Sequence, residues 1–372
     1  MKILLMGDAS NYHAALAGGL QSLGHEVCLA SDGGGWIRTP RDIDVSRGAS
    51  KAAGLALYGR MSLLQATSLR GFDVVQFISP GFIQLRPARL ESLLRRFRRQ
   101  NGSLFLSAIG YDHSLVRNLT SSHPALAYSE WQVEGRPMAW REDSNAQYDQ
   151  WMSPVLAAYN DVFYSHIDGA VTALYEYHRI IEAEHPSLPV TYGGIPVDTA
   201  GLPRHSNRTD GKIRILYACR RGREGEKGAD VLLPMLHRLE AERPGRVEIV
   251  SPPNMPFADF VRVLSGCDIV CDQLYSYTPG TTALMAMSMG VIPISGGEEE
   301  YYRFIGEPPG LRPVFNPDPL DLEGTYARLL ALVDDPELLR SMAACGPGFV
   351  RRHNDAVTVA RRFVSAWEGT GG

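Results

Sequence analysis

Three residues that could bind a phosphate, Gly280, Thr281 and Thr282, stand directly before an apolar run of strong helix formers, Ala283–Met289. A helix that begins there would offer unpaired backbone N–H groups and two hydroxyls at its positive end. Such an end is a natural seat for a phosphate or diphosphate. In the loop after the next strand, Gly296–Gly297 would let the backbone approach a ligand closely. The pattern indicates a nucleotide-diphosphate pocket, and the alternative is a capped core helix of any α/β domain.

The residues around this helix form the frame that would position such a pocket. Ile269–Cys271 is a short apolar run typical of a buried strand, and it ends at Asp272. Gly290 would end the helix, and Val291–Ile294 indicates the next strand. Three consecutive acidic residues, Glu298–Glu300, then follow the glycine pair. Strand, helix and strand in this order predict that the pocket lies at one edge of a parallel sheet.

The same alternation of strands and helices runs through both halves of the chain. The predicted strands of the first half are Lys2–Met6, His25–Ala30, Phe72–Ile78, Ser103–Ala108, Asp168–Thr172 and Val190–Tyr192. Those of the second half are Ile213–Ala218, Val247–Val250, Ile269–Cys271 and Val291–Ile294. We therefore expect an α/β protein with two Rossmann-like, doubly wound parallel-sheet domains that face a cleft. The polar linker 199–212 places the boundary between domains 1–200 and 201–352, with a terminal helix in 353–372.

Composition limits the classes of partner and compartment. The chain has 372 residues, is 44% hydrophobic and 21% charged, and carries a formal net charge of −4, which argues against nucleic acid as the main partner. Its five cysteines show no CxxC or Cys/His zinc spacing, so they are expected to be buried, reduced thiols. The first ten residues predict a strand and not a signal peptide, and no apolar run is long enough to span a bilayer. A cytoplasmic protein is expected.

A D-x-D pattern, Asp42-Ile43-Asp44, lies in the polar loop 32–50. Some sugar-transferring enzymes hold Mn²⁺ with this pattern. Three residues are little support for a metal site, so we expect solvated loop carboxylates and no bound metal.

The segment 85–100 predicts an amphipathic helix with a strongly basic side. Its arginines are Arg86, Arg89, Arg95, Arg96, Arg98 and Arg99. A basic amphipathic helix can lie on an anionic membrane surface, and the alternative is an ordinary surface helix.

A set of short motifs carries a resemblance to a known family. They are the LGHEV run at residues 23–27, Glu226-Lys227-Gly228 at the end of a basic loop, the A-M-x-x-G-x-x-P turn of Ala286, Met287, Gly290 and Pro293, and the GGIPVD turn at residues 193–198. With two α/β domains, they make the chain resemble the GT-B retaining glycosyltransferases of family 4, the "glycosyl transferases group 1" type. The resemblance covers nearly the whole chain. It implies a nucleotide-diphosphate sugar donor, no required metal or cofactor, and a C-terminal helix that packs back on the first domain.

The resemblance also implies a donor site in the second domain. An arginine and a lysine of the basic loop would bind the diphosphate, here Arg221 and Lys227, although Arg220 or Arg223 could replace Arg221. The family's paired glutamates fall on Tyr277 and Met285, so this chain departs from the pattern. Tyr277 could still stack or hydrogen-bond, whereas Met285 cannot replace a carboxylate. Glu298 or Glu300 is the expected substitute for ribose or sugar recognition.

On the first domain the resemblance points to residues after two predicted strands. Asp112 and His113 follow the strand 103–108 and are the expected catalytic contacts to the transferred sugar; the alternative for Asp112 is a turn residue that caps its own backbone. Asn11 and His13 follow the first strand, at the expected acceptor side. For His13 the alternative is an ordinary surface histidine.

The leading hypothesis is a retaining glycosyltransferase that moves a sugar to a saccharide or lipid-linked acceptor in polysaccharide or glycoconjugate synthesis. A non-catalytic nucleotide-sugar-binding homologue is the second hypothesis, because Tyr277 and Met285 replace the paired acids. A GT-B-type nucleotide-sugar epimerase is the third, although the sequence shows no cluster of acids and bases for it. A two-lobed solute receptor fits poorly with an N-terminus that does not look like a signal peptide.

Overall fold

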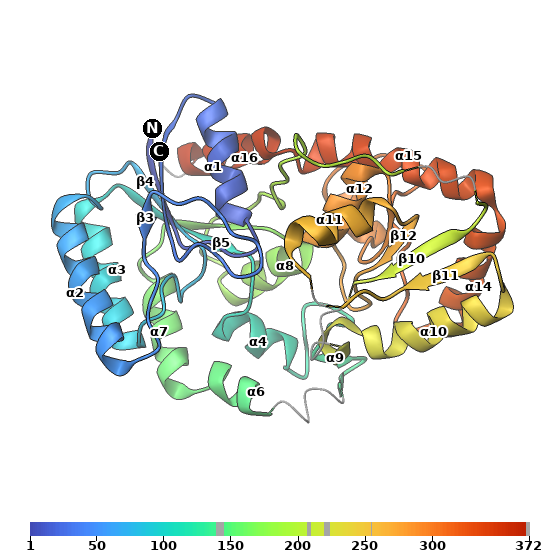
Figure 1. Cartoon of the computed structure of the whole chain (residues 1–372). Coiled ribbons are helices and arrows are strands. Elements are labelled where there is room, and N and C mark those ends of the chain that lie inside the picture. The colour runs from blue at the N-terminus through green and yellow to red at the C-terminus, as the bar shows by residue number, and fades with distance from the viewer. Residues whose placement is uncertain (139–144, 207–209, 219–223, 254, 370–372) are drawn as a thin grey trace. The chain divides into compact units, whose positions relative to one another are not determined.

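The computed structural model describes residues 1–138, 145–206, 210–218, 224–253 and 255–369 (Figure 1). Its contacts divide the chain into two compact units. Unit 1 holds residues 1–121, 145–196 and 356–372, and unit 2 holds residues 122–144 and 197–355. The segment 122–144 therefore lies in unit 2, whereas the sequence placed it inside a first domain of residues 1–200. The Rossmann-like α/β architecture expected for both halves is confirmed.

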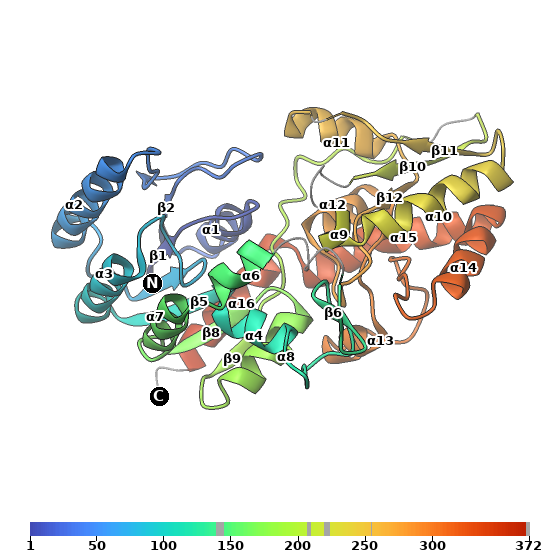
Figure 2. The same ribbon diagram turned by 90° about the horizontal axis from the view of Figure 1, so that it is seen from below.

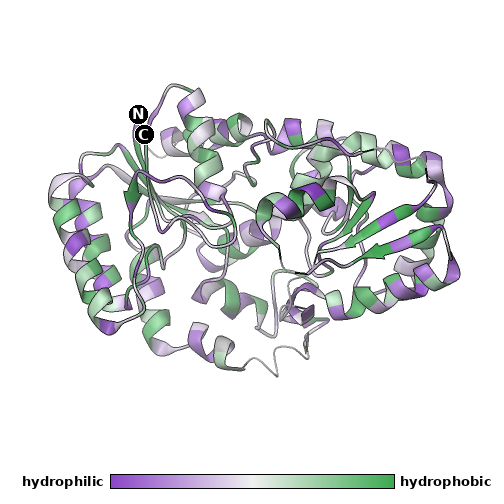
Figure 3. Ribbon diagram, in the orientation of Figure 1, coloured by the Kyte–Doolittle hydropathy of each residue, from purple (hydrophilic) through white to green (hydrophobic). Residues whose placement is uncertain are grey.

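Unit 1 is built on a seven-stranded parallel sheet in the order β3-β2-β1-β4-β5-β8-β9. The strands are short apolar runs, hydrophobic along most of their length in Figure 3, and most of their central residues are buried. Their bounds are β1 Lys2–Met6, β2 Glu26–Ser31, β3 Ile43–Asp44, β4 Val74–Phe77, β5 Ser103–Ala108, β8 Gly169–Thr172 and β9 Val190–Tyr192.

Helices connect and cover these strands (Figures 1 and 2). They are α1 Tyr12–Ser22, α2 Lys51–Thr67, α3 Pro87–Gln100, α4 His113–Leu119, α6 Asn145–Trp151, α7 Pro154–Tyr164, α8 Tyr175–Glu184 and the C-terminal α16 Ala356–Gly369. Helix α16 packs on α1, where a Cβ atom added to Gly19 would lie only 2.2 Å from the carbonyl oxygen of Ala356. The close approach of the two helices therefore depends on a glycine at position 19.

Unit 2 is built on a four-stranded parallel sheet in the order β11-β10-β12-β13. The strands are β10 Ile213–Tyr217, β11 Val247–Val250, β12 Ile269–Cys271 and β13 Ile292–Ile294, and a two-stranded hairpin adds β6 Gln132–Val133 and β7 Arg136–Pro137. The helices are α9 Glu224–Lys227, α10 Ala229–Glu242, α11 Phe257–Ser265, α12 Thr281–Met289, α13 Glu299–Phe304, α14 Leu322–Asp334 and α15 Pro336–His353. Helix α12 is buried between the sheet and α15, as its uninterrupted apolar sequence predicts.

Among the described residues, no helix combines the length and the apolar composition needed to cross a membrane. Helix α15 extends from Pro336 to His353 although it contains Pro347. Apolar burial of Phe349 and Val350 on the far side of the proline explains why the helix continues.

Candidate functional site

Residues that follow three neighbouring strands of unit 2 meet at the carboxyl edge of its parallel sheet. Lys227 ends α9, the helix after β10; Asp272 follows β12 directly; Ser295 follows β13 directly. The Lys227 ammonium donates to Asp272 Oδ1 at 2.6 Å, and the Ser295 hydroxyl donates to Asp272 Oδ2 at 3.3 Å. The side chain of Asp272 is only 2% exposed, whereas that of Lys227 is 25% exposed. Since an ammonium has three donors, Lys227 retains hydrogen-bonding capacity on its exposed side.

The N-terminus of α12 lies beside this ion pair. A Cβ atom added to Gly280, the N-cap residue, would be 3.6 Å from Asp272 Oδ2. Thr281 and Thr282 occupy the first turn of the helix, and Gly280 is its N-cap. In the described part of the chain, nothing accepts a hydrogen bond from the backbone N–H of Thr281 or Thr282. Unpaired amides, the positive end of the helix dipole and a nearby ammonium are the groups that could bind an anion here, and this place is called the anion seat below.

The glycine pair after β13 has a different role from the predicted one. A Cβ atom on Gly296 would lie 2.4 Å from the carbonyl oxygen of Ser276, and one on Gly297 would lie 3.1 Å from Val314. The glycines therefore let this loop pack against neighbouring protein backbone and side chains. The structure gives no support to the prediction that they serve the approach of a ligand.

Tyr277 and Glu298 both contact Tyr128. The ring of Tyr277 stacks on Tyr128, with centroids 4.4 Å apart, and its hydroxyl accepts a hydrogen bond from the Tyr128 N–H at 3.2 Å. The Tyr128 hydroxyl donates to Glu298 Oε1 at 2.7 Å, and the Asn316 amide donates to the same oxygen at 2.8 Å. Tyr277 is thus buried against protein, which argues against its predicted direct contact with a ligand.

This arrangement orients the carboxylate of Glu298. Both hydrogen bonds go to Oε1, and no described residue donates to Oε2. Asn316 is itself fixed, because its Oδ1 accepts from the N–H of Gly297 at 3.0 Å. Glu299 forms an ion pair with Arg312, while Glu300 is half-buried in α13 and contributes to the raised pKa of Tyr277, whose main cause is burial. Of the three acids, Glu298 is therefore the one best oriented to accept a hydrogen bond from a ligand hydroxyl.

Arg221, the predicted second cation, lies outside the described residues, as do its alternatives Arg220 and Arg223. Tyr128 and Asn316 were not predicted. Tyr128 is far from Tyr277 and Glu298 in sequence, and Asn316 belongs to no recognisable motif. Neither the periodicity nor the spacing of residues could therefore have identified them. Asp272 was visible only as a nearby acid after a strand.

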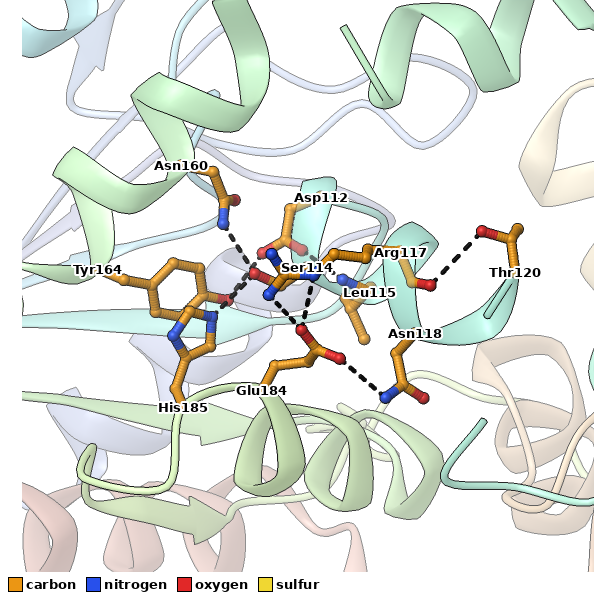
Figure 4. Close-up of polar contacts among 10 residues, drawn as sticks. All are labelled: Asp112, Ser114, Leu115, Arg117, Asn118, Thr120, Asn160, Tyr164, Glu184 and His185. Atoms are coloured by element: carbon orange, nitrogen blue, oxygen red, sulfur yellow. Dashed lines mark hydrogen bonds and ion pairs between the residues drawn. The ribbon is translucent and has the colours of Figure 1, made fainter. Parts of the chain in front are cut away.

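In unit 1, Asp112 caps a helix. Its Oδ1 accepts from the N–H of Leu115 at 2.8 Å and its Oδ2 accepts from the Tyr164 hydroxyl at 2.7 Å (Figure 4). Burial raises the pKa of Asp112, although both hydrogen bonds act in the opposite direction. The structure therefore favours the capping role. The carboxylate is buried and each of its oxygens already accepts one hydrogen bond, which argues against the predicted catalytic contact.

His113 is the first residue of α4. Its Nδ1 lies 3.0 Å from the carbonyl oxygen of Trp151, so Nδ1 carries the proton and donates it. No described residue forms a hydrogen bond with Nε2. Unlike Asp112, His113 thus keeps one ring nitrogen able to accept a hydrogen bond from a ligand.

Figure 4 shows that the surroundings of Asp112 form one polar cluster of α4, α7 and the end of α8. Asn160 donates to the Ser114 hydroxyl at 2.7 Å, and Ser114 donates in turn to His185 Nε2 at 2.8 Å. The ring of His185 stacks on Tyr164 at 3.6 Å. A pocket of about 390 Å³ beside Tyr164 and His185 is also lined by residues that precede β8 and β9. It lies at the amino end of these strands, opposite to the edge where α/β sheets bind ligands.

Of the two residues predicted on the acceptor side, His13 does not fit that role, because its side chain is buried in the core of unit 1. Asn11 has a left-handed backbone, and its side chain forms no cap for α1. His13 is fully buried: Nδ1 donates to the carbonyl of Gly7 at 2.7 Å, and Nε2 accepts from the Ser107 hydroxyl at 2.9 Å. Burial lowers the pKa of His13 to about 3. His13 is therefore a neutral core residue, neither an acceptor contact nor a surface histidine.

His13 belongs to a buried chain of hydrogen bonds. Trp367 Nε1 donates to Gln76 Oε1 at 2.9 Å, the Gln76 amide donates to the Ser107 hydroxyl at 3.0 Å, and Ser107 donates to His13. All four side chains are buried. The chain connects α16 with β4, β5 and α1, so it fixes the C-terminal helix on unit 1.

The D-x-D residues have structural partners. Asp42 accepts from the N–H of Leu29 at 2.8 Å, and Asp44 pairs with Arg41 at 2.8 Å. Within the described ranges, no group of three or more His, Cys, Asp or Glu side chains could hold a metal ion.

Comparison with protein families and with curated proteins gave no match. Solved structures are similar over nearly the whole chain. Sucrose-phosphate synthase from Thermosynechococcus elongatus has a TM-score of 0.65 at 12% identity, with 99% of both chains covered. Anabaena HepE in complex with UDP and glucose has a TM-score of 0.58 at 11% identity, again with 99% of both covered. The fold is that of the GT-B glycosyltransferases.

This GT-B fold is also found outside the transferases. A putative UDP-N-acetylglucosamine 2-epimerase from Listeria monocytogenes has a TM-score of 0.51 at 13% identity, with 98% of this chain and 94% of that chain covered. At such identities the comparisons establish the fold alone. The activity of the chain must be argued from its own residues.

Proposed function

We propose that this GT-B protein is a retaining glycosyltransferase that uses a nucleotide-diphosphate sugar. The observation that carries the proposal is the anion seat of unit 2, where Lys227 lies beside the unpaired amides that begin α12. In a transfer reaction the acceptor oxygen forms a bond to the anomeric carbon, the bond from that carbon to the diphosphate breaks, and the proton of the acceptor hydroxyl passes to the departing diphosphate. A cation and helix amides at the departing diphosphate would stabilise its developing charge.

The remaining residues have distinct proposed roles. Gly280, Thr281 and Thr282 would bind the diphosphate with Lys227, and Arg221 is a further candidate for this contact. Glu298 would accept a ribose or sugar hydroxyl through its unoccupied Oε2, and Glu300 is the second candidate for that contact. In unit 1, His113 would contact the transferred sugar through Nε2, and the turn at Asn11 would face the acceptor. No metal or cofactor is part of the proposal.

The acceptor is proposed to be a saccharide or a lipid-linked saccharide in polysaccharide or glycoconjugate synthesis. The protein would then act in the cytoplasm, at the inner face of the membrane. The uridine nucleotide in HepE makes UDP-sugars the first donors to test.

Thermal unfolding with UDP, GDP, ADP, TDP and their sugars tests the donor, because a ligand that binds only the folded state raises the unfolding temperature. We expect one nucleotide diphosphate and its sugar to stabilise the protein. The stabilising donor is then incubated with and without saccharide acceptors, and release of the nucleotide is measured. Lack of stabilisation by every nucleotide would refute the proposal.

Two alternatives have specific support. The epimerase neighbour favours a UDP-sugar epimerase, and inversion at one sugar carbon, followed by NMR without any acceptor, would establish it. The replacement of the paired acids by Tyr277 and Met285 favours a non-catalytic nucleotide-sugar-binding protein. Tight nucleotide binding without transfer, hydrolysis or epimerisation would support that reading.

A further inference from the structure

Positive charge is concentrated in one part of unit 1. Residues 45–111 contain ten Lys and Arg but only two acids, Asp73 and Glu91. This stretch carries a net charge of +8, although the whole chain has −4, so the rest of the chain has −12. It contains α2 and α3, which pack side by side (Figures 1 and 2). The formal charge of this stretch is therefore opposite in sign to that of the chain as a whole.

Helix α2 has two largely apolar faces, one buried in unit 1 and one exposed to solvent. Its inner face buries Leu57, Met61 and Gln65, and the Gln65 amide donates to the carbonyl of Leu93 in α3 at 2.9 Å. Its outer face is exposed at positions spaced by three or four residues, namely Ala52, Leu55, Ala56, Gly59, Leu63 and Ala66. Leu55 and Leu63 are 59% and 65% exposed. These six residues are called the outer stripe below.

The cations near the outer stripe have no partner among the described residues. In the described part of the chain, Lys51, Arg60 and Arg70 form no ion pair or hydrogen bond through their side chains, and the same holds for Arg86 and Arg99. No acidic residue occurs in α2. A polar surface helix normally carries both signs of charge, whereas this one combines exposed leucines with unpaired cations.

The arginines of α3 are less available to bind an anionic surface, because most of them already have partners in unit 1. Arg98 pairs with Asp168 and Arg95 pairs with Glu91, while Arg89 and Arg96 both lie against Tyr58 of α2. Four of the six arginines in 85–100 are therefore engaged within unit 1. This result shifts the predicted membrane contact from α3 to its neighbour α2.

We propose that the outer stripe of α2 docks on an anionic lipid surface. The leucines would enter the boundary between headgroups and acyl chains, and the flanking cations would bind lipid phosphates. Charge argues against a second copy of this chain as the partner, because two stretches of +8 would face each other. The exposed leucines argue against nucleic acid, whose backbone offers no apolar surface. The inference needs neither nucleotide binding nor the proposed transfer reaction.

Vesicle flotation tests this inference with the full chain. Phosphatidylcholine vesicles with and without phosphatidylglycerol are compared for wild type, the double variant Leu55→Gln/Leu63→Gln and the double variant Lys51→Gln/Arg60→Gln. Val155→Gln is the matched control, because Val155 is 65% exposed but lies on α7. All of these side chains are exposed, so the variants should remain folded, and their unfolding temperatures verify this.

We expect wild type to float with anionic vesicles and to be released by salt. The leucine variant should lose about tenfold in partitioning, since interfacial binding scales with buried apolar area, and the cation variant should lose its preference for anionic lipid. The control should bind like wild type. Wild type that fails to bind anionic vesicles, or a leucine variant that binds equally well, would overturn the inference.

A dimer in lipid-free solution that the leucine variant abolishes would instead identify a self-association surface. Nucleotide-induced stabilisation, measured in the same variants, should stay unchanged and so separates this outcome from failure of the donor site.

Discussion

The ammonium of Lys227 lies 2.6 Å from the carboxylate of Asp272, although the two residues are 45 positions apart, one at the end of α9 and the other directly after β12. Asp272 is buried and Lys227 is partly exposed, and the pair lies beside the start of α12. Asp272 therefore positions a cation at a helix N-terminus, where a diphosphate would meet both.

Lys227→Met should weaken binding of the stabilising nucleotide diphosphate by roughly tenfold to a hundredfold, the effect of losing one charge-assisted hydrogen bond. It should also lower the free energy of unfolding by up to about 3 kcal/mol, because Asp272 stays buried without its partner. Isothermal calorimetry and chemical denaturation measure the two effects. As a control, Lys227→Met/Asp272→Asn should recover stability but not affinity. Unchanged affinity in Lys227→Met would refute the phosphate contact.

Tyr128→Phe should reduce affinity for the nucleotide sugar by roughly threefold to tenfold while the ring still stacks on Tyr277. The lost hydroxyl is one of two donors that orient Glu298. Glu298→Gln should cost more, and the double variant should cost less than the sum, because both changes act on one carboxylate. Tyr159→Phe, which removes a buried hydroxyl in unit 1, is the control and should leave binding unchanged. Strict additivity in this cycle would show that Tyr128 does not act through Glu298.

Asp112→Ala should lower the free energy of unfolding by about 1–2 kcal/mol, the usual cost of losing a helix N-cap, with a further loss from the unpaired Tyr164 hydroxyl. Asp112→Asn keeps an oxygen for the N–H of Leu115 and should be milder. Thermal unfolding and donor turnover are measured together. Turnover that survives in the folded Asn variant is expected for a capping residue. Its complete loss at normal stability would restore the catalytic assignment.

The free energy of unfolding should fall as the pH decreases from 6.5 toward 3, in part because of His13. The pKa of His13 is about 3 in the folded protein and 6.5 ordinarily, so in this window the unfolded chain binds a proton that the folded chain does not. One such proton lowers stability by as much as about 1.4 kcal/mol per pH unit. Chemical denaturation over a series of pH values should show a shallower slope for His13→Gln. An identical slope in both proteins would contradict the buried, neutral state of His13.

Much of the fold could be predicted because its signals are local. Short apolar runs separated by amphipathic segments indicate parallel strands and covering helices within a window of a few residues, and both sheets confirm this alternation. The start of α12 was also visible, since Gly280, Thr281 and an unbroken apolar run are adjacent in sequence. Lys227 was identified through the resemblance of its loop to a known family.

The tertiary structure alone decided which polar side chains remain available. Asp112 and His13 have types suited to chemistry, but partners distant in sequence, Tyr164 and Ser107, occupy them and burial changes their pKa values. Conversely, Tyr128 carries no motif, yet the fold brings it onto Glu298 from 170 positions away. The sequence by itself determined the elements, because their periodicity is local. Pairing, burial and the division of the chain into units depend on contacts between distant residues, and only the folded chain specifies those.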